Sequence, residues 1–229
     1  MVHNDGYSSH IGQDMWVAEV FNQRSPGFFL DFGAFDGVLI SNTLYLEKRL
    51  NWTGLCVEPN PRYFENLCKE RNVVCINSAL WPISRISLQF ADAHGLSSIE
   101  EYINSDSNSS NRINATKQMI SVDTINPTEL MDRFNVPREI DYMSLDVEGA
   151  EMDVLGSMDL EKYKISLMTI EHNHVVDKKM RVRAHLANYG YDVVSHRNDD
   201  FFFLRDFPFP NNPKEVLESV ATKFQVLHY

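Results

Sequence analysis

Carboxylates gather at the end of the apolar run 140–147, where the segment DVEGAE (146–151) places three acids within six residues. Like charges this close raise one another's pKa unless a cation or a hydrogen-bond donor lies among them. A helix N-terminus favours acidic side chains, which accounts for Glu151 but accounts poorly for Asp146, because Asp146 still lies on the expected strand. The sequence therefore predicts that Asp146 and Glu148 face a positive group: an ammonium, a sulfonium or a metal ion.

A second polar group follows the apolar run 28–32, in the segment DFGAFDG (31–37). Gly33 and Gly37 permit a tight turn that brings backbone close to a ligand, although glycine turns after strands are also common without one. The spacing differs from the GxGxxG of dinucleotide-binding folds. Two acids, Asp31 and Asp36, disfavour a pyrophosphate here and favour an amine or a sulfonium.

Two further strand ends carry residues that suit a nucleoside. Glu58, followed by Pro59, comes 27 residues after Asp31 and can accept hydrogen bonds from both hydroxyls of a ribose. Ser78 and Ala79 are small and suited to lie beside an adenine. An exposed charge at a strand end and an ordinary turn are the alternative interpretations.

The segment EHNH (171–174) follows another expected strand. If the chain stays extended, His172 and His174 share one face, and Glu171 points to the other. A histidine at this edge could act as a general base near neutral pH. It could also bind a metal together with Asp146, and the remaining alternative is a satisfied polar turn.

These groups are placed by a regular alternation of strands and helices. Apolar runs at 28–32, 53–58 and 73–80 alternate with helical patterns at 41–50 and 61–71, which indicates a parallel sheet with crossover helices. The pattern returns in later runs, with strands expected at 140–147, 165–171, 191–196 and 200–205 and helices at 150–158 and 177–190. The last two strands face each other across a short turn, which predicts a closing hairpin.

The middle of the chain has a different character. Residues 84–91 and 117–125 are expected as strands and 127–134 as a short helix, whereas 104–116 is so rich in Ser and Asn that we expect a loop too polar to enter a core. We interpret residues 92–116 as an insertion or lid. A loop of this length within a compact domain is usually functional or disordered.

Composition narrows the class of protein. A chain of 229 residues with 43% hydrophobic residues supports one large domain. The net charge of −11 makes nucleic acid an improbable partner, and no apolar stretch is long enough to span a membrane. Three cysteines without CxxC spacing are expected to be buried thiols in a reducing compartment, and the first ten residues resemble no secretory signal. We therefore expect a cytoplasmic protein, and the oligomeric state stays open.

Taken together, these segments resemble the FkbM family of S-adenosylmethionine-dependent O-methyltransferases. The resemblance covers roughly residues 11–205, and LDVEGAE at 145–151 is its most specific part. It also includes FFLDFGAFDG, CVEPN, NSALW, GLSSI, IEHNH and an upstream GQD. It implies a Rossmann-like α/β fold: a seven-stranded, mostly parallel sheet of order 3-2-1-4-5-7-6, with helices on both faces and an antiparallel last strand.

The resemblance also implies roles along the chain. Residues 1–26 would close over the cofactor through Gln13, and 207–229 would be a tail with a short helix. The expected cofactor-binding residues are Gln13, Asp31, Gly33, Ala34, Asp36, Gly37, Ser41, Asn42, Thr43, Glu58, Pro59, Ser78, Ala79 and Asp146. The expected acceptor-binding residues are Ser97, Ser98, Glu151 and His174.

The predicted reaction is methyl transfer from the sulfonium to a hydroxyl oxygen, which needs alignment and removal of the hydroxyl proton. His172 is the predicted base, with Glu148 near the acceptor. The alternative is Mg²⁺ or Mn²⁺ on Asp146, Glu171 and His172. We expect a sugar acceptor, a deoxysugar such as rhamnose within a glycan. The alternative functions are methylation of a natural-product hydroxyl, a nicotinamide-dependent sugar oxidoreductase and an inactive methyltransferase-like binding module.

Overall fold

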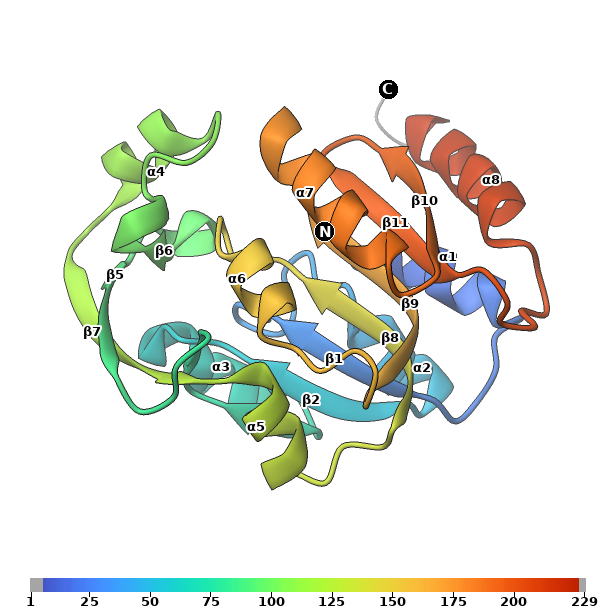
Figure 1. Ribbon diagram of the computed structural model, residues 1–229, viewed down its shortest axis with the longest axis horizontal. Coiled ribbons are helices and arrows are strands. Elements are labelled where there is room, and N and C mark those ends of the chain that lie inside the picture. The colour runs from blue at the N-terminus through green and yellow to red at the C-terminus, as the bar shows by residue number, and fades with distance from the viewer. Residues whose placement is uncertain (1–5, 227–229) are drawn as a thin grey trace.

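A seven-stranded sheet forms the centre of the computed structural model, which describes residues 6–226 and the side chains as far as residue 223 (Figure 1). Its strand order is β3-β2-β1-β8-β9-β11-β10, and only β11 runs opposite to the other strands. Numbered along the chain, this order is 3-2-1-4-5-7-6, so the predicted fold class and the closing hairpin are confirmed. The strands are β1 (Phe28–Phe32), β2 (Thr53–Val57), β3 (Val74–Ile76), β8 (Glu139–Leu145), β9 (Lys164–Glu171), β10 (Tyr191–His196) and β11 (Asp199–Leu204).

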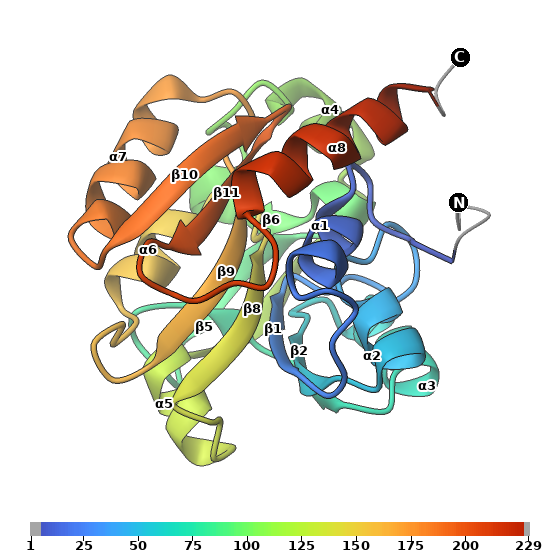
Figure 2. The ribbon, with the colours of Figure 1, turned by 90° about the vertical axis from the view of Figure 1, so that its right-hand side faces the viewer.

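Helices cover both faces of this sheet (Figure 2). One face carries α5 (Pro127–Arg133), α6 (Glu151–Gly156) and α7 (Val176–Ala187). The other face carries α1 (Gln13–Val20), α2 (Leu44–Leu50), α3 (Pro61–Glu70) and α8 (Pro213–Val226). Each face encloses its own hydrophobic core, as a sheet buried on both sides requires.

Side-chain alternation explains how one apolar run serves both cores. In β1, Leu30 and Phe32 enter the core under α5–α7, and Phe29 enters the other core. Asp31 shares the face of Phe29, because successive side chains of a strand point to opposite faces. A carboxylate thus lies at the end of a strand whose other side chains are apolar, and it is only 3% exposed.

A smaller second sheet was not predicted. It has the order β4-β7-β5-β6, and the expected strand 73–80 is divided between β3 of the large sheet and β4 of this one. Its strands are β4 (Ala79–Leu80), β5 (Ser87–Ala91), β6 (Ser98–Ile99) and β7 (Met119–Ile125). Two short 3₁₀ turns, His94–Leu96 and Glu100–Tyr102, flank β6.

The expected polar loop at 104–116 is partly helical, as α4 (Ser109–Ala115). The expectation that it stays out of any core was wrong for Arg112, whose side chain is fully buried. Burial of this charge is compatible with folding because two carboxylates lie against it. We refer to residues 92–116 as the lid segment.

The two ends of the described chain lie side by side. Helix α1 lies against α8, and the indole N–H of Trp16 donates to the carbonyl of Pro213 at 2.9 Å. The predicted tail helix is therefore part of the fold, whereas residues 1–5 and 227–229 of the predicted end segments lie outside the described residues.

Two expectations drawn from composition, buried cysteines and the absence of a membrane-spanning segment, can be compared with the structure. The three cysteines are free, as expected, but only Cys56 is buried, since Cys75 is half-buried and Cys68 exposed. Within residues 6–226, no helix combines the length and the apolar character of a membrane span.

Gly33 follows β1 directly and packs against the backbone of Asp146, so replacing it tests this close contact. Its φ is +94°, and an added Cβ would lie 1.7 Å from the backbone oxygen of Asp146. We expect Gly33→Ala to lower the free energy of unfolding by about 2–4 kcal/mol, because both the backbone conformation and the contact oppose a side chain. Urea unfolding measures this. Gly156→Ala is the matched control, since an added Cβ there meets nothing within 4 Å; equal losses in the two variants would contradict the explanation.

Candidate active site

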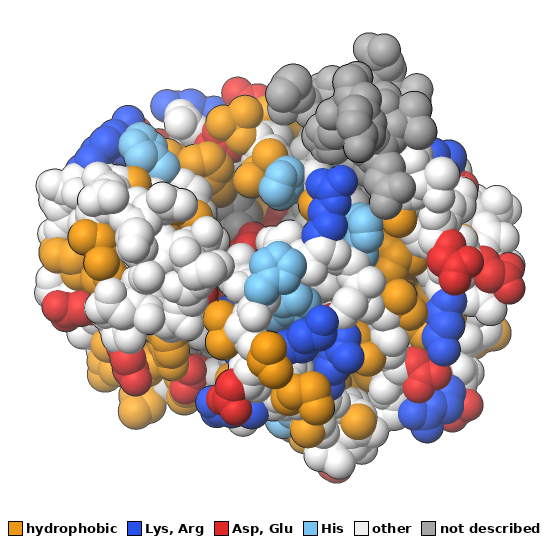
Figure 3. Space-filling view, turned by 90° about the horizontal axis from the view of Figure 1, so that it is seen from above, with side chains coloured by type: hydrophobic (Ala, Val, Ile, Leu, Met, Phe, Trp, Pro, Cys, Tyr) orange, Lys and Arg blue, Asp and Glu red, His pale blue; other side chains and the backbone are white. Residues whose placement is uncertain are grey.

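A hollow opens at the carboxyl ends of β1, β2 and β8, where ligands bind in open α/β sheets. Seen from above, acidic side chains are visible inside it, and histidine and hydrophobic side chains surround its mouth (Figure 3). The second sheet and the lid segment form its opposite wall, through residues such as Phe90, His94 and Ile99. The predicted residues that line it are Asp31, Gly33, Ala34, Ser41, Asn42, Glu58, Pro59, Ser78, Ala79, Ser97, Asp146 and Glu148.

The turn after β1 is shaped by contacts within the protein. Gly33 makes room for the Asp146 carbonyl, and a Cβ on Gly37 would lie 2.7 Å from the Leu67 side chain. Asp36 accepts hydrogen bonds from the backbone N–H groups of the two residues that follow Gly37, at 3.0 and 2.8 Å. Gly37 and Asp36 are not among the described residues that line the hollow, so the turn explains them without a ligand.

Glu58 is held rigidly at the end of β2. One carboxylate oxygen accepts the N–H of Phe35 at 3.0 Å, and the other accepts the N–H of Asn60 at 2.7 Å. The residue is 6% exposed, and burial raises its pKa to about 7, although the two hydrogen bonds act in the opposite direction. A buried carboxyl of fixed orientation lines the hollow where the sequence predicts a ribose contact.

Asp31 belongs to a buried network behind the hollow. Thr43 donates its hydroxyl to Asp31 at 2.5 Å, and Arg71 donates to Thr43 at 2.8 Å and to Glu47. Burial raises the pKa of Asp31, and the positive charge of Arg71 opposes that rise. Thr43 has no exposed surface, so the structure uses it to orient Asp31 and does not bring it to the cofactor side.

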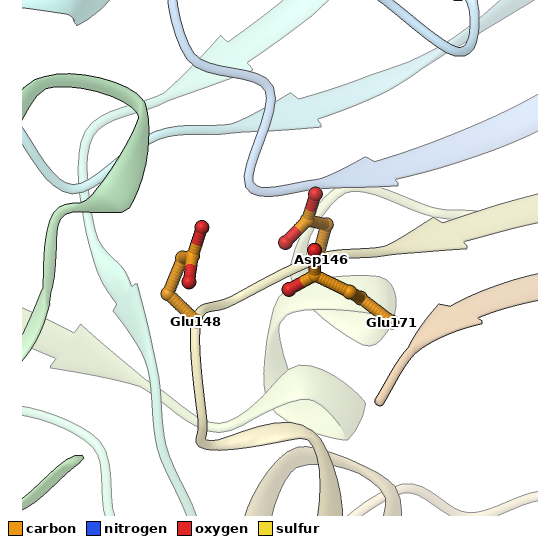
Figure 4. A group of neighbouring side chains, drawn as sticks. All are labelled: Asp146, Glu148 and Glu171. Carbon is orange, nitrogen blue, oxygen red and sulfur yellow. The ribbon is translucent and has the colours of Figure 1, made fainter. Parts of the chain in front are cut away.

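Three carboxyl groups meet at the ends of β8 and β9 (Figure 4). Oxygen atoms of Asp146, Glu148 and Glu171 all lie within 4.8 Å of one another. Burial and the neighbouring negative charges raise the pKa of Asp146 to about 6 and that of Glu148 to about 8, and they raise the pKa of Glu171 well above its usual value. Near neutral pH this cluster therefore retains protons, as closely spaced acids do.

Two cations pair with acids of the segment 146–151, and sequence reasoning missed both. Arg112 Nη2 is 2.7 Å from Glu148 Oε2, and Lys178 Nζ is 2.6 Å from Glu151 Oε2. Glu151 is fully buried in this ion pair and does not line the hollow, so the structure does not offer it to an acceptor. No local pattern marks Arg112, which stands in a Ser/Asn-rich segment 36 residues before Glu148.

The histidines are placed differently from the prediction. The chain does not stay extended after Glu171, because Asn173 and His174 have φ values of 47° and 60°. His172 is 2% exposed, its Nε2 lies 3.6 Å from Asp200 Oδ1, and its Nδ1 accepts the N–H of His174. His172 and His174 are not among the described lining residues, and His172 does not join the three carboxylates. We therefore assign neither residue a role in the chemistry.

Two other predicted residues point elsewhere. Gln13 donates to Asp199 at 2.9 Å and accepts from the backbone of Ile11, so α1 is joined to β11 and does not cover the hollow. Ser98 is fully buried and lies outside the lining.

Much of the remaining lining is apolar, and its residues were not singled out from the sequence. These residues are Phe35, Leu39, Ile40, Val57, Leu80, Phe90, Ile99, Val147 and Ala150. His94 and Gly95 also contribute, and His94 Nδ1 lies 2.8 Å from the Tyr63 hydroxyl. Apolar walls with a few fixed polar groups are typical of small-molecule sites.

Two buried oxygen atoms of residues that line the hollow have no hydrogen-bond donor among the described residues. Within residues 6–226, no donor satisfies Asp146 Oδ1 or Asn42 Oδ1, although both residues line the hollow. Buried polar atoms are normally hydrogen-bonded, so a ligand that brings donors and positive charge fits here. The amino group and sulfonium of S-adenosylmethionine would meet this requirement.

Comparison with known proteins agrees with this geometry. A family model described as the methyltransferase FkbM domain matches residues 31–193. None of the curated proteins compared with the chain matches it in sequence.

Several solved structures share a low level of similarity with the chain. A precorrin-6y C5,15-methyltransferase from Geobacter metallireducens GS-15 is 11% identical over 88% of this chain and 95% of that one, with a TM-score of 0.47. A methyltransferase from Pyrococcus furiosus is 12% identical, over 86% and 83%, with a TM-score of 0.46. The N-terminal domain of human METTL16 is 12% identical, over 82% and 66%, with a TM-score of 0.44. At these values none of the three indicates a substrate for this chain.

The raised pKa of Glu58 predicts how stability depends on pH. Between the ordinary value of 4.5 and about 7, the folded chain keeps a proton that the unfolded chain has released. The free energy of unfolding therefore falls as pH rises through this range, by about 3 kcal/mol from Glu58 alone. We expect Glu58→Gln, which cannot titrate, to flatten the fall by that amount in urea unfolding between pH 4.5 and 7.5. The same flattening from Glu65→Gln, an exposed control on α3, would show that Glu58 is not the source.

Proposed function

Because the chain belongs to the FkbM methyltransferase family, we propose that it transfers a methyl group from S-adenosylmethionine to a hydroxyl group of a sugar, specifically a deoxysugar such as rhamnose within a glycan. The observation that carries the proposal is the hollow itself. It brings the carboxyls of Asp31, Glu58 and Asp146 to one edge of the sheet and leaves a buried oxygen of Asp146 without a donor.

The chain's own residues divide the work of holding the cofactor. Glu58 would receive the ribose hydroxyls, Asp146 and Asn42 would accept from the amino group, and Ser78 and Ala79, which also line the hollow, would lie beside the adenine. When bound, S-adenosylmethionine supplies a methyl group already activated by positively charged sulfur. The acids at this edge stabilise that charge in the bound state, and the apolar walls keep water from the reacting atoms.

Glu148 is the residue we propose to take the proton of the acceptor hydroxyl. Its Oε2 is held by Arg112 at 2.7 Å, whereas Oε1 accepts no hydrogen bond within residues 6–226. Burial and the neighbouring acids raise its pKa to about 8, so its ionised form takes a proton more strongly than an ordinary glutamate, although only a minor fraction is ionised at neutral pH. Glu148 lines the hollow and thus replaces His172, the base predicted from sequence.

The lining supports a hydroxyl-rich acceptor with one apolar group. Glu148, Ser97 and His94 offer hydrogen bonds to hydroxyls on the lid side of the hollow. Leu39 and Ile40 line the hollow while staying more than half exposed, at 54% and 53%, which suits the methyl group of a deoxysugar. The net charge of −11 disfavours a polyanionic acceptor.

Two of the alternative functions are tested by the experiments below. A non-sugar hydroxyl as acceptor and an inactive binding module are both compatible with the family, whereas the family match leaves no support for the nicotinamide-dependent oxidoreductase.

Asp146, Glu148 and Glu171 also form a possible site for Mg²⁺ or Mn²⁺, with Glu148 in the place predicted for His172. Such an ion would lower the pKa of the acceptor hydroxyl. We favour Glu148 instead, because the positive charge of Arg112 already lies against it and offsets part of the charge of the cluster.

A transfer assay with radiolabelled S-adenosylmethionine and a panel of oligosaccharides tests the proposal, with product mass spectrometry to locate the methyl group. We expect Glu148→Gln to lower the transfer rate by about 10²–10⁴-fold, because the hydroxyl loses its proton acceptor. Calorimetry should show S-adenosylhomocysteine, and not NAD, bound equally well by the wild type and this variant.

Glu101→Gln on the exposed side of the lid segment is the control and should transfer at the wild-type rate. We expect chelation with EDTA to leave transfer unchanged. Activity lost to EDTA and restored by Mg²⁺ or Mn²⁺ would assign hydroxyl activation to the ion. A wild type that binds S-adenosylhomocysteine but methylates nothing would favour the binding module.

A further inference from the structure

Arg112 occupies an unusual position for a residue of a polar segment. Its side chain has no exposed surface. Its guanidinium donates to both oxygens of Asp106, at 3.1 and 2.9 Å, and to Glu148 at 2.7 Å. Arginine paired in this forked geometry is a strong and directional contact. One cation therefore joins the lid segment to the residue that we propose as proton acceptor.

The same guanidinium organises the lid segment itself. It donates to the backbone oxygens of Leu96 at 2.9 Å, Ile103 at 3.1 Å and Tyr102 at 3.4 Å. These oxygens come from both sides of the turn Glu100–Tyr102. Burying the charge is compatible with this structure only because the lid segment folds around it and supplies acceptors.

The loop that carries Glu148 lies directly under the lid segment. We refer to residues 146–151 as the acid loop. Glu148 and Gly149 have φ values of 52° and 125°, and a Cβ on Gly149 would lie 2.5 Å from the Cβ of Tyr102. The backbone at Glu148 is thus in a conformation that L residues rarely adopt, and external contacts must hold it there.

Asp106 extends the contact to the end of β9. Asn173 donates to Asp106 Oδ2 at 3.2 Å and to Glu171 Oε2 at 2.6 Å, and Ser107 donates to the carbonyl of Asn173 at 3.4 Å. The pair Asp106–Arg112 therefore contacts both loops from which the three clustered carboxylates project.

We infer that Arg112 is a positioning residue that aims Glu148 at the acceptor and, with Asp106, holds the lid segment against both carboxylate-bearing loops. The inference rests on the proposed function for the role of Glu148. The lid wall and the proton acceptor then form together, because one guanidinium holds both. Arg112 itself does not line the hollow, so cofactor binding does not depend on it directly.

The test compares Arg112→Gln, Glu148→Gln and the double variant with Arg85→Gln as control. Arg85 precedes β5, outside the lid segment; its ion pair with Glu129 is at the surface, and 80% of its side chain is exposed. Hydrogen–deuterium exchange is followed in peptides covering 98–108 and 146–151. Calorimetry measures the binding of S-adenosylhomocysteine, and steady-state kinetics gives kcat and KM with the best acceptor of the panel.

We expect Arg112→Gln to speed exchange at least tenfold in both peptides and to lower kcat at least a hundredfold. Binding of S-adenosylhomocysteine should change less than threefold. In the Glu148→Gln background the same substitution should lower kcat no further, which a general loss of structure would not reproduce. Arg85→Gln should resemble the wild type in every measurement.

Two results would overturn the inference: unchanged exchange in 146–151 for a folded Arg112→Gln, or kcat losses that multiply in the double variant. If Arg112→Gln does not fold, Asp106→Asn is read in the same way, since it removes one side of the pair. Failure of the proposed function is distinguishable, because a wild type without transfer activity still shows whether Arg112 controls exchange in the acid loop.

Discussion

Negative charge held out of water is the constraint on which this structure depends. The parallel sheet brings Asp31, Glu58 and Asp146 to one edge, and the chain adds Glu148 and Glu171 beside them. Buried carboxyls are unfavourable unless they are paired, protonated or matched by a ligand. All three occur in this protein. Arg71 lies against Asp31 and Arg112 against Glu148, and the pKa of Asp146 is raised. The Oδ1 atom of Asp146 has no hydrogen-bond donor among the described residues, so a ligand can supply one.

The rest of the fold arranges that edge. Two hydrophobic cores fix the sheet from both faces, so the strand ends are rigid platforms for the acids. The insertion between β3 and β8 builds the opposite wall from a second sheet and the lid segment. Arg112 couples this wall to the acid loop through Glu148, whereas most of the residues proposed to hold the cofactor lie on β1, β2 and the start of the second sheet. We therefore expect changes at Arg112 to affect acceptor handling more than cofactor binding.

The sequence predicts this sheet well because alternation and run length are local properties. Leu30, Phe32 and their neighbours mark a buried strand by type alone, and the acids at the strand ends stand out against them. Gly33 lines the hollow as predicted, and the Asp146 carbonyl adds a reason for glycine that the sequence does not show. Arg112 could not be found, because its partner Glu148 is brought near only by the folded insertion. The strand ends at Glu171 as predicted, but only Glu171 joins the carboxylate cluster, and the next side chain, His172, lies against Asp200.

The central claim is that the acidic edge exists to receive a positively charged donor, and proton linkage measures this directly. Calorimetry of S-adenosylmethionine binding at pH 7, repeated in buffers of different ionisation enthalpy, reports the protons exchanged on binding. A cation placed among acids of raised pKa lowers those pKa values, so binding should release protons. The release should be larger for S-adenosylmethionine than for S-adenosylhomocysteine, because the sulfur of S-adenosylhomocysteine is uncharged. Equal release for the two ligands, or proton uptake with the sulfonium, would contradict the account.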